Sequence, residues 1–161
     1  MQYCEHAQER IDRLQESLLE TSRNYQNRIA ELEHMNSKYI CTFGEWFMMT
    51  RYFNIQEFRC KDGDRLVVVE KELIERLAEL RRQIGKPIHI TSGFRTRTHN
   101  TAVGGATNSR HLDGSAADIT AEGITPQQMA ELAELVGFRG IGIYGSFTHV
   151  DTRPAKAYWR G

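Results

Sequence analysis

The chain has 161 residues, of which 40% are hydrophobic and 26% are charged, and this composition fits one packed domain with an appendage. Its 21 Lys and Arg residues balance its 21 Asp and Glu residues, so the overall charge gives no argument for nucleic-acid binding. The three cysteines, Cys4, Cys41 and Cys60, are widely spaced and form no CxxC pair, which argues against a cysteine zinc site. Their odd number argues against a closed disulfide framework.

The first segment is predicted to be a long helix. Residues 5–39 contain no glycine or proline and are rich in good helix formers. Apolar and aromatic residues recur at alternating steps of three and four from Cys4 to Tyr39, and Thr21 and Arg28 interrupt the series. This seam is typical of a coiled coil, and the alternative is a single amphipathic helix packed on its own domain. We favour a homo-oligomer through residues 5–39, because a helix of about 50 Å is longer than a small domain.

The remainder of the chain alternates between helical and extended patterns. Helical spacing predicts helices over residues 67–84 and 125–137. Alternation of apolar and polar residues predicts strands over residues 88–94 and 115–120 and a hairpin over 140–153. Residues 98–110, rich in glycine, threonine and asparagine, are predicted to form a loop. The expected fold is therefore α+β, with a small antiparallel or mixed sheet and flanking helices. The predicted boundaries are 1–46 for the helical segment and 47–161 for this domain.

The six histidines are unevenly distributed, and half of them fall in or beside the loops and the hairpin of the second domain. These are His99, His111 and His149. His6 and His34 lie among charged residues of the first segment and are expected on a solvated helix face. His89 alternates with isoleucines in a predicted strand, so it is expected to be exposed or structural.

The stretch NSRHLDGSAADI places His111 and Asp118 seven residues apart around a glycine. One interpretation is a turn that happens to hold two polar residues, and the other is a pair of metal ligands. Catalytic zinc sites usually have three protein ligands, and His and Asp supply suitable donors. Seven extended residues would span about 23 Å, so a turn around Gly114 is required to bring the two side chains together. His149 could supply a third ligand, and Asp151 lies on the same strand face.

Three motifs follow one another along the second domain. Ser109, His111, Gly114, one of the two following alanines and Asp118 match the pattern Ser-x-His-x-x-Gly-x-Ala-x-Asp. The upstream stretch ITSGFRTRTHNTAVGGA and the downstream stretch FTHVDTR match its usual companions. Together they resemble the D-Ala-D-Ala carboxypeptidase-like zinc peptidases. That group includes L-alanyl-D-glutamate endopeptidases and belongs to the lysostaphin/carboxypeptidase/hedgehog fold family. The resemblance covers about residues 50–155.

The resemblance implies a metal site and a substrate-facing arginine. The implied ligands of Zn²⁺ are His111, Asp118 and His149. The implied reaction is hydrolysis of a peptide bond by a water that the metal activates. Arg95 matches an arginine that faces the substrate, where a fixed charge stabilises a developing oxyanion. The alternative for Arg95 is a structural salt bridge. Ser92 and His99 are further candidate substrate contacts.

The catalytic base is where this chain departs from the pattern. Many relatives carry an acid three residues before the last histidine, and this chain has Ser146 there. We nominate Asp151 as the base, with the alternative that it orients His149 or pairs with Arg153. A substrate groove or simple packing would each account for the aromatic residues Tyr144, Tyr158 and Trp159.

The expected function is a zinc metallopeptidase, either D-Ala-D-Ala carboxypeptidase-like or a peptidoglycan endopeptidase, that cleaves bacterial stem peptides or crosslinks. The alternative is a catalytically silent, zinc-stabilised binding or structural module on a coiled-coil stalk. We expect peptidoglycan peptides as partners, with no nucleic acid and no membrane span. We also expect no signal peptide. The protein would be made in the cytoplasm and would act at the cell wall after release, as a phage or prophage lysis protein, or as part of a phage particle.

Overall fold

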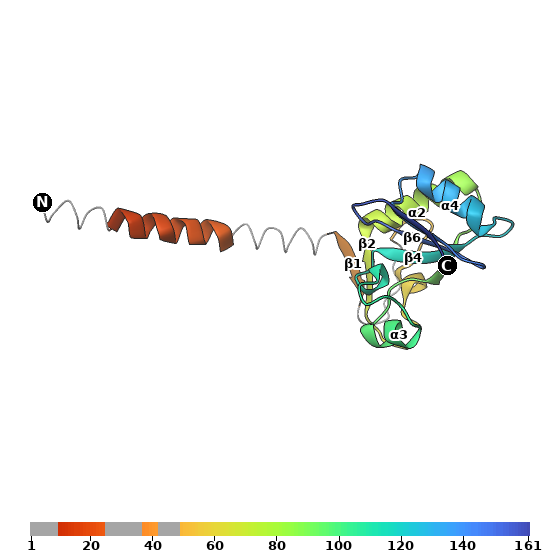
Figure 1. Cartoon of the computed structure of the whole chain (residues 1–161), viewed down its shortest axis with the longest axis horizontal. Coiled ribbons are helices and arrows are strands. Elements are labelled where there is room, and N and C mark those ends of the chain that lie inside the picture. Colours follow the sequence, from red (N-terminus) through yellow and green to blue (C-terminus); the bar gives the residue numbers. More distant parts are fainter. Residues whose placement is uncertain (1–9, 25–36, 42–48) are drawn as a thin grey trace, which may run out of the picture. The chain divides into compact units, whose positions relative to one another are not determined.

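The computed structural model describes residues 10–24, 37–41 and 49–161, and the chain divides into two compact units, Met1–Asn36 and Ser37–Gly161. In the first unit, residues 10–24 are helical, which confirms the predicted N-terminal helix over that range (Figure 1). Seam residues Ile11, Leu14 and Leu18 are exposed on it. Most of the predicted seam lies outside the described residues, so the coiled coil stays a prediction. Among the described residues, no helix has both the length and the apolar character needed to cross a membrane.

The second unit begins with a strand instead of the end of the long helix. Strand β1 (Lys38–Cys41) pairs antiparallel with β2 (Val67–Glu70) to form a two-stranded sheet. The compact unit that holds these strands runs from Ser37 to Gly161, and the boundary at residue 47, which lies outside the described residues, stays a prediction. The helix predicted over 67–84 is also shorter than expected, because its first four residues form β2. Three consecutive valines favour a strand, and Val67 and Val69 are fully buried on one face of it.

A mixed sheet forms the centre of the second unit, which confirms the predicted small antiparallel or mixed sheet, and it has five strands. Its strands lie in the order β3-β4-β6-β5-β7, and only β5 and β7 run parallel. The bounds are His89–Ser92 for β3, Ala116–Thr120 for β4, Gly140–Ile143 for β5, Thr148–Asp151 for β6 and Ala157–Arg160 for β7. The predicted hairpin is confirmed as β5 and β6, whereas β7 at the edge was not foreseen.

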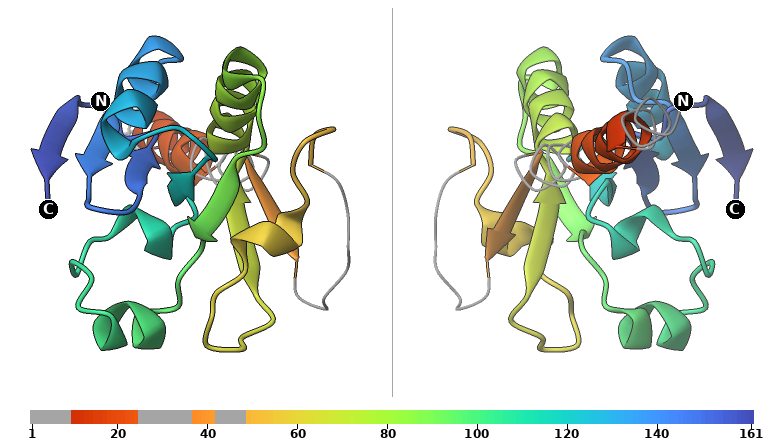
Figure 2. Two further views of the ribbon diagram at one scale, coloured as in Figure 1. Left: turned by 90° about the vertical axis from the view of Figure 1, so that its right-hand side faces the viewer. Right: turned by 90° about the vertical axis from the view of Figure 1, so that its left-hand side faces the viewer.

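The described part of the second unit has three α-helices besides the sheet. They are α2 (Lys71–Ile84), α3 (Arg97–Ala102) and α4 (Pro126–Leu135). α2 and α4 lie at one end of the domain and α3 at the other in both views of Figure 2. Gly85 ends α2 in the left-handed conformation, and the Thr125 side chain caps α4. α3 occupies part of the segment predicted as a loop. It forms because the Thr96 hydroxyl accepts a hydrogen bond from the His99 amide and caps its first turn.

The two faces of the central sheet have different roles. Ala117, Ile141 and Val150, from three adjacent strands, are buried in the hydrophobic core. This core also holds buried residues of α2 and α4, among them Leu77 and Met129. The residues that alternate with them along each strand project from the opposite face. That second face carries the polar cluster described next.

Candidate active site

One row of residues crosses the sheet and defines the floor of the site. The register pairs Ser92 with Asp118, Asp118 with His149, His149 with Gly142, and Gly142 with Trp159. Paired residues of neighbouring strands project from the same face of a sheet, so the side chains of the row lie side by side. The row therefore places an aspartate, a histidine and a tryptophan in sequence above the sheet.

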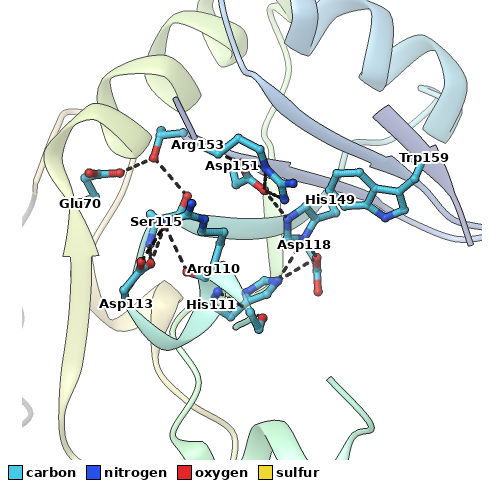
Figure 3. A network of polar contacts seen from close by, with 12 residues as sticks. Glu70, Arg110, His111, Asp113, Ser115, Asp118, His149, Asp151, Arg153 and Trp159 are labelled. Atoms are coloured by element: carbon cyan, nitrogen blue, oxygen red, sulfur yellow. Dashed lines mark hydrogen bonds and ion pairs between the residues drawn. The ribbon is translucent and has the colours of Figure 1, made fainter. Parts of the chain in front are cut away.

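Two histidines and one aspartate converge at the centre of this row (Figure 3). Nε2 of His111 lies 3.2 Å from Oδ1 of Asp118 and 3.1 Å from Nδ1 of His149. Nδ1 of His149 lies 2.9 Å from the same carboxylate oxygen. All three residues are buried, and their candidate donor atoms lie within 4.8 Å of one another. Within the described ranges, no other group of His, Cys, Asp and Glu side chains has this arrangement. The structure thus brings together the three residues for which the resemblance implied zinc binding.

A tight turn delivers His111 to the cluster. Gly114 has φ of 78°, and a Cβ atom there would lie 2.2 Å from the backbone oxygen of Val68. Only glycine fits both the left-handed backbone and the close approach to β2. The short 3-10 helix Arg110–Leu112 before the turn carries His111, and the hydroxyl of Ser109 caps it. The turn that the sequence required between the two ligands is therefore present.

The outer nitrogen of each histidine is held by an acceptor. Nδ1 of His111 donates to the backbone oxygen of Gly93 at 2.6 Å, and Nε2 of His149 donates to Oδ2 of Asp151 at 3.2 Å. Each bond fixes the tautomer, so both inner nitrogens face the cluster with lone pairs. When both imidazoles are neutral, two lone pairs and the Asp118 carboxylate oppose one another with no hydrogen between them. A cation satisfies this arrangement, and two imidazoles with one carboxylate are a donor set that Zn²⁺ accepts.

The ionisation of the cluster follows from these contacts. Burial alone would raise the pKa of Asp118, but hydrogen bonds and charge from His111 and His149 hold it well below its usual range. Burial alone would lower the pKa of His149, but the carboxylates of Asp118 and Asp151 raise it above the ordinary value. A proton therefore binds His149 more tightly than it binds an isolated histidine, and it competes with a metal ion for the same nitrogen.

Asp151 lies beside His149 on the same face of β6 and is not among the residues that line the cavity. Its side chain has no solvent exposure, and Arg153 binds it through Nε at 2.8 Å to Oδ1 and through Nη2 at 2.5 Å to Oδ2. Burial would raise the pKa of Asp151, but hydrogen bonds from His149 and Arg153 hold it well below its usual range. Of the two roles considered for Asp151, this geometry fits orientation of His149, because a base must reach the reacting water.

Arg95 reaches the cluster from the loop after β3. Its Nη2 donates to Oδ2 of Asp118 at 2.6 Å, its Nε donates to Oγ of Ser92 at 2.9 Å, and its amide donates to the His111 carbonyl at 2.9 Å. Ser92 therefore holds Arg95 and does not line the cavity. His99 is half-buried on α3 and is not among the cavity-lining residues. Of the candidate substrate contacts, only Arg95 faces the cavity beside the cluster.

A cavity of about 660 Å³ opens above the cluster. Three arginines face it, namely Arg95, Arg110 and Arg153, and its aromatic wall consists of Tyr144, Phe147 and Trp159. Asp118 is the only carboxylate among its described lining residues. Ser146 is exposed and does not line the cavity, so the described residues place no acid where relatives keep their base. Tyr158 is also exposed and lines a separate shallow pocket.

Two glycines of β5 make room for the site, and neither was predicted to belong to it. A Cβ on Gly142 would lie 2.5 Å from the Trp159 ring, and one on Gly140 would lie 2.0 Å from Oδ1 of Asp151. Trp159 can therefore lean across β5 until its ring lies 5.3 Å from that of His149. The signal was present in the sequence as Gly-Ile-Gly-Ile, where glycine occupies alternate positions on one strand face.

Comparison with known proteins agrees with this geometry. The family described as Peptidase M15 matches residues 51–151, which is more than half of the chain and includes all three residues of the cluster. The zinc D-Ala-D-Ala carboxypeptidase of Streptomyces albus G is 43% identical over 67 residues, covering 41% of this chain and 26% of that protein. The chain thus spans about a quarter of the length of this curated relative. From the extent of the family match, the chain belongs to the peptidase M15 family.

Proposed function

We propose that the protein is a zinc-dependent peptidase that hydrolyses peptide bonds in bacterial peptidoglycan, in stem peptides or in crosslinks. The observation that carries the proposal is the convergence of His111, Asp118 and His149 at the base of an open cavity, with Arg95 beside them. The family membership and the relative named a zinc carboxypeptidase support the same chemistry.

Each residue of the cluster has a separable task. His111 and His149 would present neutral nitrogens to Zn²⁺, and Asp118 would present Oδ1 while its Oδ2 stays bonded to Arg95. When bound, Zn²⁺ lowers the pKa of water and polarises a carbonyl group. The Arg95 guanidinium is held in place by Ser92 and provides a fixed positive charge where negative charge develops on the substrate.

The cavity favours a substrate that carries carboxylates. Arg110 and Arg153 add two guanidinium groups to that of Arg95, and guanidinium groups bind carboxylates in a bidentate manner. Arg153 is already paired with Asp151, and Arg110 lies 3.6 Å from Asp113, so these two charges are largely offset and a bound Zn²⁺ would supply the net positive charge of the cavity. An acidic peptide fits this charge. D-Ala-D-Ala, L-Ala-D-Glu and crosslink bonds all suit the same metal chemistry.

The direct test is incubation of the purified protein with peptidoglycan, with and without a zinc chelator, followed by measurement of newly formed amino groups. The proposal predicts release that the chelator abolishes and that added zinc restores. His111→Ala should lose zinc, whereas Ser146→Ala should retain both zinc and activity. If no amino groups are released in a chelator-sensitive manner, the proposed peptidase activity is rejected.

One observation favours the alternative, a catalytically silent zinc-stabilised binding or structural module. The described cavity holds no carboxylate besides the ligand Asp118, so no acidic base is available for proton transfer. This alternative predicts zinc binding and retention on peptidoglycan without any hydrolysis. A pull-down with insoluble peptidoglycan, run beside the amino-group assay, separates the two functions.

We further propose that the protein acts at the cell wall, after release as a phage or prophage lysis protein or as part of a phage particle. Its N-terminal helix would associate with copies of itself through residues 5–39. The exposure of Ile11, Leu14 and Leu18 on the described part of this helix supports an apolar contact there. Light scattering should then show an oligomer for the full chain and a monomer for Leu14→Asp/Leu18→Asp.

A further inference from the structure

A phenol hydroxyl in the cavity has a hydrogen to donate and no partner in the described part of the chain. Nε1 of Trp159 donates to the Tyr144 hydroxyl oxygen at 3.1 Å. An indole nitrogen can only donate, so the Tyr144 oxygen accepts this bond and keeps its own O–H for another group. The cavity wall that includes Tyr144 is where a substrate would meet that hydrogen.

The Tyr144 ring is held rigidly. It stacks on Phe147 with ring centroids 4.5 Å apart and planes 12° apart, and the Tyr144 amide donates to the Phe147 carbonyl at 3.0 Å. Gly161 also packs against the Tyr144 ring, since a Cβ atom at Gly161 would lie 2.2 Å from Cε1 of that ring. A donor fixed in this way needs little reorganisation when a substrate arrives.

The position of Tyr144 relative to the metal cluster follows from the sheet. Asp118 and His149 lie on the adjacent strands β4 and β6. Arg95 follows β3 on one side of this pair, and Tyr144 follows β5 on the other. Trp159 joins Tyr144 to the cluster, because its ring lies 5.3 Å from that of His149. Arg95 and Tyr144 thus follow strands on opposite sides of the pair that carries Asp118 and His149, and both line the cavity.

We infer that the Tyr144 hydroxyl is a second catalytic donor, which binds the scissile carbonyl oxygen as it becomes negative and complements Arg95. This inference rests on the proposed peptidase function. No proton is transferred in this role, since the O–H bond stays intact and only the hydrogen bond strengthens. The inference gives Tyr144 a role in stabilising the transition state, whereas the sequence alone allowed either a place in a substrate groove or simple packing.

The test is Tyr144→Phe, which keeps the stacked ring and removes only the hydroxyl. We expect kcat to fall about a hundredfold with KM nearly unchanged, because the bond is made mainly in the transition state. A phosphinate peptide that mimics the tetrahedral state should bind the variant more weakly by a similar factor. Binding of the product peptide, which lacks the tetrahedral centre, should change little. Tyr158→Phe, an exposed tyrosine outside the cavity, is the matched control and should behave as wild type.

A second variant guards against loss of folding. Trp159→Phe keeps a ring beside His149 but removes the N–H that anchors the phenol, so kcat should fall about tenfold while zinc content is retained. An unchanged kcat in Tyr144→Phe, or a rise in KM alone, would overturn the inference while the peptidase function stands. A wild-type protein without chelator-sensitive hydrolysis would overturn both.

Discussion

Asp118 and His149 are direct partners in the register of β4 and β6, and Oδ1 of Asp118 lies 2.9 Å from Nδ1 of His149. Two of the three candidate ligands are therefore fixed by the hydrogen bonds of a central strand pair. The third, His111, arrives on the turn at Gly114 and is locked by the Gly93 carbonyl. Ligands on strands are positioned more precisely than ligands on mobile loops, which suits a site that must keep its geometry during turnover.

The contact between Asp151 and His149 predicts a specific effect on metal binding. Asp151→Asn should weaken zinc affinity by about 10–100-fold, because the amide cannot fix the His149 tautomer as the carboxylate does. Competition with a chromogenic chelator measures this change. Ser146→Ala, at an exposed position outside the cavity, is the control and should bind zinc as wild type does. Equal zinc affinity in both variants would reject the orienting role of Asp151.

The two glycines of β5 predict a stability effect that depends on position. Gly140→Ala and Gly142→Ala should each destabilise the fold by about 1–3 kcal/mol, since the added methyl group meets Asp151 or Trp159. Gly145→Ala is the matched control, because a Cβ there has no neighbour within 4 Å and its backbone carries no positive φ. Urea denaturation of the three variants checks the order. A control variant as unstable as the other two would contradict the packing explanation.

Arg95 predicts a loss of rate that is separate from metal binding. Arg95→Ala should lower kcat about 10²–10³-fold, since it removes a fixed charge beside the reacting carbonyl. Zinc content should persist, because both histidines and the Asp118 carboxylate remain. Arg97→Ala, exposed on α3 and outside the cavity, should leave kcat unchanged. Atomic absorption measured beside steady-state kinetics would expose a purely structural Arg95, for which zinc and activity would be lost together.

The raised pKa of His149 predicts opposite pH trends for the two metal states. In the zinc-free protein, protonated His149 stabilises the fold fully below its ordinary pKa of 6.5, and this contribution is lost as pH rises through the raised value. In the zinc-loaded protein the metal displaces that proton, so zinc affinity and activity fall as pH decreases through the same range.

The measurable result is the difference in melting temperature between zinc-loaded and zinc-free protein, which should widen between about pH 5 and pH 8. Activity should likewise be lost towards about pH 4, where histidine ligands are protonated. A constant difference in melting temperature across this range, or full activity at the acid end, would show that these histidines do not hold the metal.

Much of the site could be predicted from the sequence because its residues lie in short motifs with strong local signals. His111, Gly114 and Asp118 fall within one stretch, and the turn between them is dictated by the reach of the chain. The hairpin that carries His149 was readable from alternation. The predicted metal ligands meet because β4 and β6 are adjacent, and local pattern alone does not fix that adjacency.

The parts that sequence reasoning did not reach depend on tertiary contacts. β1 and β2 form because each supplies the other with a partner strand, although their residues also fit longer helical patterns. Trp159 joins the site only through the parallel pairing of β7 with β5. The role of Asp151 required its burial and its bond to Arg153, since position on a strand face alone allowed either catalysis or support.

The central claim, that this cluster performs zinc-dependent hydrolysis of peptidoglycan peptides, is tested most directly by mass spectrometry of digested stem peptides. Peptidoglycan would be treated with the zinc-loaded protein, with the chelated protein, and with His111→Ala. We expect peptides that have gained one water at a single type of bond, and only in the sample treated with the zinc-loaded wild type. Identical peptide profiles in all three samples would contradict it.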